Sequence, residues 1–228
     1  MKFSRWFFPL ILLLIIHPVI AQEEGEEESS PFPVYRYPAA FIKFSPLALM
    51  ELPNPSFQVA LEYRIGWPMY LQHELGWIMP VPGNSFFNEG NGSGGGKFKT
   101  EFRYYLEDAQ SDIFLPRRTY LAFEGMYRVR IFHREGWETM NDGSFSQWLE
   151  MDEYRHQAAF HFKYGKIMSF SPGGRLYVDS YLGIGLRRYF STARQLTGAL
   201  AGEPNLDRWS YDYVLPSISV GFKLGFGI

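Results

Sequence analysis

The chain has 228 residues, with 22 lysines and arginines against 24 aspartates and glutamates, and its formal net charge is −2. This balance provides no basic excess of the kind that binds nucleic acid. The chain contains no cysteine, which excludes disulfide bonds, thiolate metal sites and lipidated cysteines, and nothing in it predicts a metal or a cofactor. Aromatic residues make up 18% of it, and 22 glycines and 15 prolines accompany them, a composition that favours strands and turns over helices.

The first 21 residues have the form of a secretory signal peptide. Lys2 and Arg5 give a positive start, residues 6–16 form an almost wholly apolar run, and the small side chain of Ala21 precedes a predicted cleavage site. A membrane anchor is the alternative, but this run is shorter than the roughly 20 residues that a helix needs to cross a bilayer. We therefore expect the mature chain to begin at Gln22.

Residues 22–38 form an acidic leader that begins QEEGEEESSPFP. It has almost no apolar side chain to bury, so we expect it to be disordered and solvated, with binding of a cation or a partner as the alternative. No later stretch approaches 18 consecutive apolar residues. After export, residues 39–228 therefore either form a soluble domain or cross a membrane as strands.

Eight later segments show the period-two alternation of apolar and polar residues that is typical of strands. They cover residues 41–49, 57–65, 69–78, 98–106, 120–133, 154–164, 176–189 and 215–226. Most are longer than the roughly five or six residues of an average soluble strand, and they match the roughly 9–11 residues of a tilted membrane strand. The sequence therefore predicts an all-β fold, an eight-stranded antiparallel up-and-down transmembrane β-barrel.

The two faces of these segments differ in character. In the second segment, Phe57, Val59 and Leu61 alternate with Gln58, Ala60 and Glu62. In a membrane barrel the apolar row meets lipid and the charged row fills the lumen, whereas a soluble barrel has the opposite arrangement. Aromatic residues near the segment ends, among them Trp67, Trp77, Tyr120, Tyr189 and Tyr213, favour the membrane barrel because such rings gather at lipid headgroups.

The charged rows contain both signs in neighbouring positions, which would allow the side chains to pair. A barrel of eight strands has a narrow lumen that side chains fill, so buried charges there must be paired and no large pore remains. We expect a lumenal charge network formed by Glu62, Arg64, Glu101, Arg103, Glu124, Arg128, Asp179 and Arg187.

The connections alternate in length as an outer-membrane barrel requires, with two exceptions. Tight turns are expected at 66–68 and 172–174, and long outer loops at 79–97, 134–153 and 190–214. The first outer connection, near Pro53, is short, and the connection at 107–117 is longer than expected. The glycine-rich stretch 88–96 predicts a flexible loop and lacks the Gly-Lys-Ser/Thr of a phosphate-binding loop.

Four stretches resemble small outer-membrane barrel proteins. They are LPSISVGFKLGFGI at 215–228, LYVDSYLGIGLRRY at 176–189, IKFSPLAL at 42–49 and FQVALEYRIG at 57–66. Together the chain resembles the eight-stranded outer-membrane β-barrels of Gram-negative bacteria, of the Bacteroidota type with OmpA/OmpW-like architecture, although it ends in Gly227-Ile228 rather than in an aromatic residue. The resemblance implies a monomer in the cell outer membrane, with membrane lipids, lipopolysaccharide and the barrel-assembly machinery as partners; it implies no catalytic residues.

Three classes of function remain open. The first, which we favour, is a structural barrel or one that interacts through its loops. The second is an outer-membrane lipid-modifying hydrolase or transferase, for which His133, His156, Asp152 and Ser144 around the fifth connection are the candidate catalytic residues. The third is an exported lipocalin-like barrel that binds an apolar ligand. His156 and His161 are five residues apart and so face opposite sides of a strand, which excludes a metal site shared by the two unless the strand contains a bulge.

Overall fold

Eight antiparallel strands form one closed barrel in the computed structural model, and each strand pairs with its neighbours in chain order. The all-β, up-and-down barrel predicted from the alternation is confirmed. The structure describes residues 38–49, 55–80, 92–106, 117–139, 146–170, 175–197 and 211–228. The predicted signal peptide, nearly all of the acidic leader and the tight turn at 172–174 lie outside the described residues. No helix among the described residues is long and apolar enough to cross a membrane.

The strands are β1 (Ala40–Phe44), β2 (Ser56–Gly66), β3 (Met69–Ile78), β4 (Gly92–Tyr105), β5 (Arg117–Thr139), β6 (Ser146–Ser169), β7 (Leu176–Thr197) and β8 (Asp212–Gly227), with a short 3-10 helix η1 (Pro46–Leu49) after β1. The third predicted segment matches β3 at both ends. The first predicted segment, 41–49, was wrong in its second half, because Pro46 has no amide hydrogen for a strand ladder and begins η1 instead.

Strands β4 to β7 extend into segments predicted to be loops. The predicted loop at 134–153 is largely a hairpin, in which Thr139 of β5 pairs with Ser146 of β6. The glycine-rich stretch enters β4, where a Cβ at Gly95 would overlap the backbone of Val129 on β5. Glycine permits this close backbone approach, and it has no side chain that could show alternation. The alternation of side chains therefore could not predict where these strands end.

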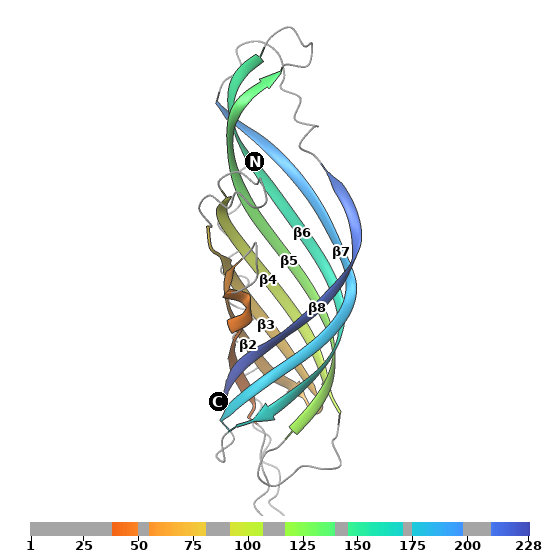
Figure 1. Cartoon of the computed structure of the whole chain (residues 1–228). Helices are drawn as coiled ribbons and strands as arrows, with labels where there is room; N and C mark the ends of the chain where they lie inside the picture. Colours follow the sequence, from red (N-terminus) through yellow and green to blue (C-terminus); the bar gives the residue numbers. More distant parts are fainter. Residues whose placement is uncertain are drawn as a thin grey trace, which may run out of the picture. The chain divides into compact units, whose positions relative to one another are not determined.

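The strands differ greatly in length around the barrel. Strands β5, β6 and β7 contain 23, 24 and 22 residues, against 11 and 10 in β2 and β3. Figure 1 shows that these three strands project well beyond the ends of β2 and β3. The barrel closes where β1 meets β8 in a short ladder that runs from Phe41 opposite Gly227 to Phe44 opposite Leu224.

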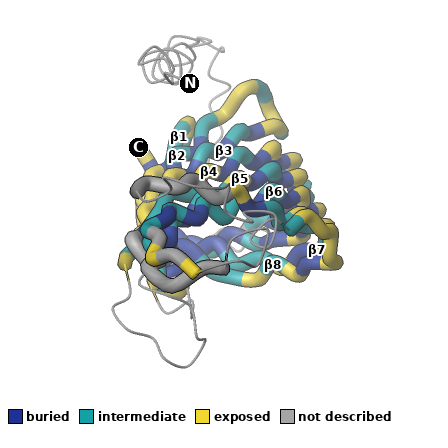
Figure 2. The backbone as a smooth tube through the Cα atoms, turned by 90° about the horizontal axis from the view of Figure 1, so that it is seen from above, coloured by how far each residue is buried: buried dark blue, intermediate teal, exposed yellow. Residues whose placement is uncertain are grey.

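The apolar rows face outward and the charged rows face inward. Ile184, Val220 and Phe160 have 68%, 73% and 59% of their surface exposed, whereas the inward side chains of Ala159 and Lys223 are buried. Seen from above, buried positions alternate with more exposed positions along the strands (Figure 2). The outer wall is thus apolar and the lumen is lined by polar and charged groups.

An aromatic layer closes the lumen at the end where Ala40 and Ile228 are hydrogen-bonded. The centres of successive rings are 4.9 to 6.4 Å apart, and all the rings are buried. In order, the layer consists of Tyr177, Phe41, Tyr70, Tyr105 and Tyr120. The prediction of an interfacial position for Tyr120 was wrong. Its place on the inward row of β5 turns the ring into the lumen, where it packs on Tyr105.

Candidate functional site in the barrel lumen

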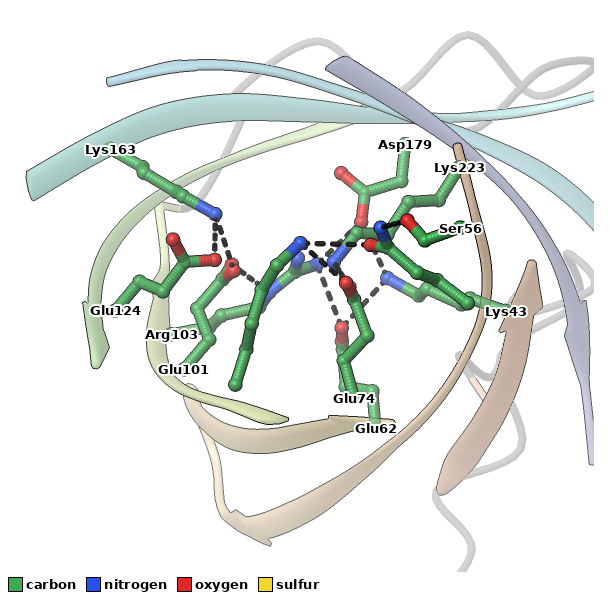
Figure 3. A network of polar contacts seen from close by, with 12 residues as sticks. Lys43, Ser56, Glu62, Glu74, Glu101, Arg103, Glu124, Lys163, Asp179 and Lys223 are labelled. Carbon is green, nitrogen blue, oxygen red and sulfur yellow. Dashed lines mark hydrogen bonds and ion pairs between the residues drawn. The ribbon is translucent and has the colours of Figure 1, made fainter. Parts of the chain in front are cut away.

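Ten charged side chains form a layer across the lumen next to the aromatic layer, and every strand contributes at least one. Their residues are 0 to 7% exposed. The layer contains five carboxylates, Glu62, Glu74, Glu101, Glu124 and Asp179, and five cations, Lys43, Lys99, Arg103, Lys163 and Lys223. We call this set the charge layer. Figure 3 shows its members pointing toward one another from opposite walls.

Arg103 of β4 is at the centre of the layer. Its Nη1 is 2.7 Å from Glu62 Oε2 and 2.7 Å from Asp179 Oδ2. Its Nε donates to Glu101 Oε1 at 2.6 Å, and its guanidinium lies 4.2 Å from the centre of the Tyr120 ring. The guanidinium thus joins β2, β4 and β7 through two of its nitrogens.

Lys43 of β1 repeats part of this arrangement. Its ammonium is 2.7 Å from both Glu62 Oε2 and Asp179 Oδ2, so the two carboxylates share the cations Lys43 and Arg103. Their remaining oxygens accept from the aromatic layer, since Tyr105 donates to Glu62 and Tyr120 donates to Asp179, each at 2.6 Å. Both carboxylates therefore exchange the hydrogen bonds of water for bonds from the protein.

A second group of contacts continues the layer toward β5 and β8. Lys163 is 3.0 Å from Glu101 Oε2 and 2.5 Å from Glu124 Oε2. Glu124 also lies 3.0 Å from His161 Nδ1, and the other ring nitrogen of His161 is 2.9 Å from Ser217 Oγ on β8. An unbroken chain of contacts thus runs from β1 to β8 through the interior.

Glu74 of β3 completes the layer. It is paired with Lys223 at 2.6 Å and with Lys99, whose ammonium also donates to Gln58 at 3.1 Å. Charges removed from water are tolerated only when they are paired and hydrogen-bonded. The equal numbers of acids and bases allow each charge in the layer to be paired, although the buried Nη2 of Arg103 has no hydrogen-bond partner among the described residues. The layer thus places paired side chains across the lumen.

The residues predicted for the lumenal network occupy three different places. Glu62, Glu101, Arg103, Glu124 and Asp179 lie in the charge layer, and Glu101 contacts Arg103 as the spacing suggested. Arg64 is exposed beside the β2–β3 turn. Arg128 and Arg187 are half-buried and lie farther from the aromatic layer, on the inward rows of β5 and β7.

Half of the layer was absent from the predicted network. The alternation had placed Lys99, Glu74, Lys163 and Lys223 on polar rows, but their partners come from other strands. The predicted pairs joined near neighbours on one strand, whereas Asp179 contacts Arg103 of β4 across the lumen. The stagger of strands in a closed barrel decides which residues meet at one level, and a single strand's pattern does not contain it.

The candidate catalytic residues lie outside the lumen. His133 and Asp152 are direct cross-strand partners on the outer face, with Nδ1 3.1 Å from Oδ1. His156, also on the outer face, lies 2.7 Å from the Tyr127 hydroxyl and stacks on Phe190. Ser144 lies outside the described residues. A histidine oriented by a carboxylate, as His133 is by Asp152, has one of the contacts that a general base needs.

The described residues contain no cluster of three or more histidine, aspartate or glutamate side chains suited to a metal ion. No family model, curated protein or solved structure matches the chain. Function is therefore inferred from the faces of the barrel and the contacts inside it.

Proposed function

We propose that the chain is an outer-membrane β-barrel protein with a filled, non-conducting lumen and a structural or loop-mediated interaction role. Export would use the signal peptide predicted at residues 1–21. The observation that carries the proposal is the inversion of polarity, with apolar rows outside and paired charges inside. This arrangement suits a wall that contacts lipid and does not suit one that contacts water.

The outer surface supports this proposal on energetic grounds. Soluble monomers rarely expose apolar patches larger than a few hundred Å². Here outward leucine, isoleucine, valine and phenylalanine side chains recur on β2, β3, β4, β7 and β8, and most expose 40% or more of their surface. Water would solvate such a wall poorly, whereas hydrocarbon would not penalise it. The inward rows, in turn, offer charged groups to an interior ligand, which does not favour a lipocalin-like binder of apolar molecules.

The filled lumen supports a role at the surface rather than in conduction. The charge layer and the aromatic layer obstruct the same narrow passage, and eight strands leave little space once side chains fill it. The projecting ends of β5 to β7 lie at the end of the barrel away from the aromatic layer. In this proposal the projecting wall and its connections meet partners, with lipids and lipopolysaccharide around the apolar belt.

Lysine placed on the outer wall tests the membrane assignment. Changing Ile184 and Val220 to lysine should cost about 2–4 kcal/mol at each site near the bilayer midplane, so folded protein should be lost from outer membranes. The measurement is the heat-dependent shift in gel mobility of membrane fractions from cells that express the full chain. Thr192→Lys is the control, because Thr192 also faces outward but lies farther along β7. Normal accumulation of the double variant in folded form would contradict the proposal.

A further inference from the structure

A serine, a histidine and a glutamate are hydrogen-bonded in series at the edge of the charge layer. Ser217 Oγ of β8 lies 2.9 Å from His161 Nε2, and His161 Nδ1 lies 3.0 Å from Glu124 Oε1 on β5. All three residues are buried. Hydrolases activate a serine through the same arrangement, in which the nucleophile contacts a base and a carboxylate orients that base.

The carboxylate fixes the direction of both hydrogen bonds. Lys163 lies 2.5 Å from the other oxygen of Glu124 and stabilises its ionised form (Figure 3). An ionised carboxylate can only accept, so His161 Nδ1 donates to it. The lone pair of a neutral His161 is then on Nε2, and the Ser217 hydroxyl donates to that nitrogen. In this tautomer the histidine can take the proton of the serine.

Glycine at position 185 allows the histidine to reach the serine. Gly185 of β7 is the register partner of both His161 on β6 and Ser217 on β8. A Cβ on Gly185 would overlap the backbone of Phe160 and His161, so this close approach of β6 and β7 requires a glycine. His161 therefore contacts a strand that is not its neighbour in the sheet, past a position that has no side chain.

The lumenal face of β8 is accessible to solvent beside this serine. Tyr213 and Leu215 precede Ser217 on the same inward row, and 46% and 47% of their surface is exposed. Strand β8 pairs with β1 only from Leu224 onward, so no described strand covers the edge of β8 beside Ser217. Ser217 itself is 8% exposed. The serine thus borders an accessible part of the lumen whose wall includes apolar side chains.

Arg187 of β7 has a donor that the described residues do not use. It is two residues beyond Gly185 on the same inward row and lies opposite Leu215 of β8. Its Nη1 donates to the Tyr189 hydroxyl at 3.1 Å, whereas its buried Nε has no hydrogen-bond partner among the described residues. Such buried donors are uncommon because they cost free energy. A cationic donor on the strand beside the serine suits the oxyanion that forms in acyl transfer.

We propose that this site hydrolyses a carboxylic ester with an apolar acyl group, with Ser217 as nucleophile, His161 as base and Glu124 as positioning residue. Ser217 Oγ attacks the carbonyl carbon while its proton passes to His161 Nε2, and Arg187 stabilises the negative oxygen. His161 then gives the proton to the leaving oxygen, which departs as the alcohol. Water attacks the acyl-serine and gives a proton to His161, which returns it to Ser217 Oγ as the carboxylic acid departs.

This activity goes beyond the proposed role at the surface and needs only the lumen of the closed barrel. Release of nitrophenolate from p-nitrophenyl butyrate tests it, with the full chain folded in dodecyl maltoside, a detergent that contains no ester. We expect saturable turnover, and covalent labelling of Ser217 by a fluorophosphonate, identified by mass spectrometry. Ser217→Ala should abolish turnover. His161→Gln should lower kcat at least about a hundredfold, because a general base contributes roughly 10²–10⁴-fold. Glu124→Gln should lower kcat and leave KM unchanged, since an amide no longer fixes the tautomer of His161.

Ser219→Ala is the matched control, because Ser219 lies on the same inward row, two residues from Ser217 and opposite Gly183. It should react with both probes as the unaltered chain does, and the heat-dependent shift in gel mobility checks the folding of each variant. Turnover by the unaltered chain no greater than that of Ser217→Ala, or no label on Ser217, would overturn the proposal. A second assay with vesicles of phosphatidylglycerol assigns the source of the ester. Release of fatty acid indicates a lipid ester, hydrolysis of the nitrophenyl ester alone indicates a soluble one, and both results support the site.

Discussion

Replacement of Arg103 by methionine is expected to lower the free energy of unfolding of the barrel by about 3–5 kcal/mol, because removing one partner from a buried ion network leaves the others uncompensated. Arg103 contacts Glu62, Glu101 and Asp179, and all of these side chains are almost fully buried. Lys43 and Lys163 would then be the remaining cations of that group. The measurement is the midpoint of urea unfolding of the full chain in lipid vesicles.

Two further variants separate the loss of pairing from the loss of any arginine. Arg188→Met removes an exposed ion pair with Asp212 and should change the midpoint little, since such pairs are solvent-screened. Asp179→Asn combined with Arg103→Met removes one uncompensated carboxylate and should recover part of the loss. If Arg103→Met and Arg188→Met unfold at the same urea concentration, the charge layer does not stabilise the barrel as described.

Alanine at position 165 is expected to destabilise the barrel by about 3 kcal/mol or more, because of overpacking and a lost hydrogen bond to a charged group. Gly165 of β6 lies directly opposite Tyr120 of β5, and the Tyr120 ring occupies the space above the glycine. A Cβ there would overlap the ring. Tyr120 would have to move, and its hydroxyl would lose the 2.6 Å bond to Asp179.

Gly125→Ala is the control for this substitution. A Cβ at Gly125 would meet only Phe160 and Thr100 at 3.8 Å, an ordinary contact. Alanine should therefore be neutral or stabilising there, because glycine loses more conformational freedom on folding. Urea unfolding in vesicles compares the two variants. Equal stability of Gly165→Ala and the unaltered chain would show that the packing of Tyr120 on β6 is not required.

The number of strands and the direction of their faces were predictable from alternation alone, because a period of two assigns every other side chain to one face. As expected, Phe57 on β2 and Phe98 on β4 face outward, whereas Gln58 and Lys99 face the lumen. The lengths of β5, β6 and β7 were not predictable in this way. Beyond His133 and before Tyr154 the residues pair through their backbones, whatever their side chains.

Which charged side chains pair inside the lumen could be identified only from the structure of the closed barrel. Arg128 was predicted to pair with Glu124, four residues away on the same strand. Glu124 instead contacts Lys163 and His161 of β6. Spacing along a strand identifies side chains on one face, but the stagger and the narrow diameter decide which of them meet.

The short ladder between β1 and β8 makes the barrel unequal in strength around its circumference. Four residue pairs join these strands, whereas the β5–β6 ladder runs along the whole of β5. A hairpin with local contacts forms before a junction between the two ends of a chain, since closing the longer loop costs more entropy. Closure at β1 would thus be the last step of assembly and the first to reverse. Lys43 resists this reversal from inside, because its ammonium reaches past β8 to Asp179 on β7 and so ties the first strand to the seventh. The charge layer therefore stabilises the junction between β1 and β8 in addition to obstructing the lumen.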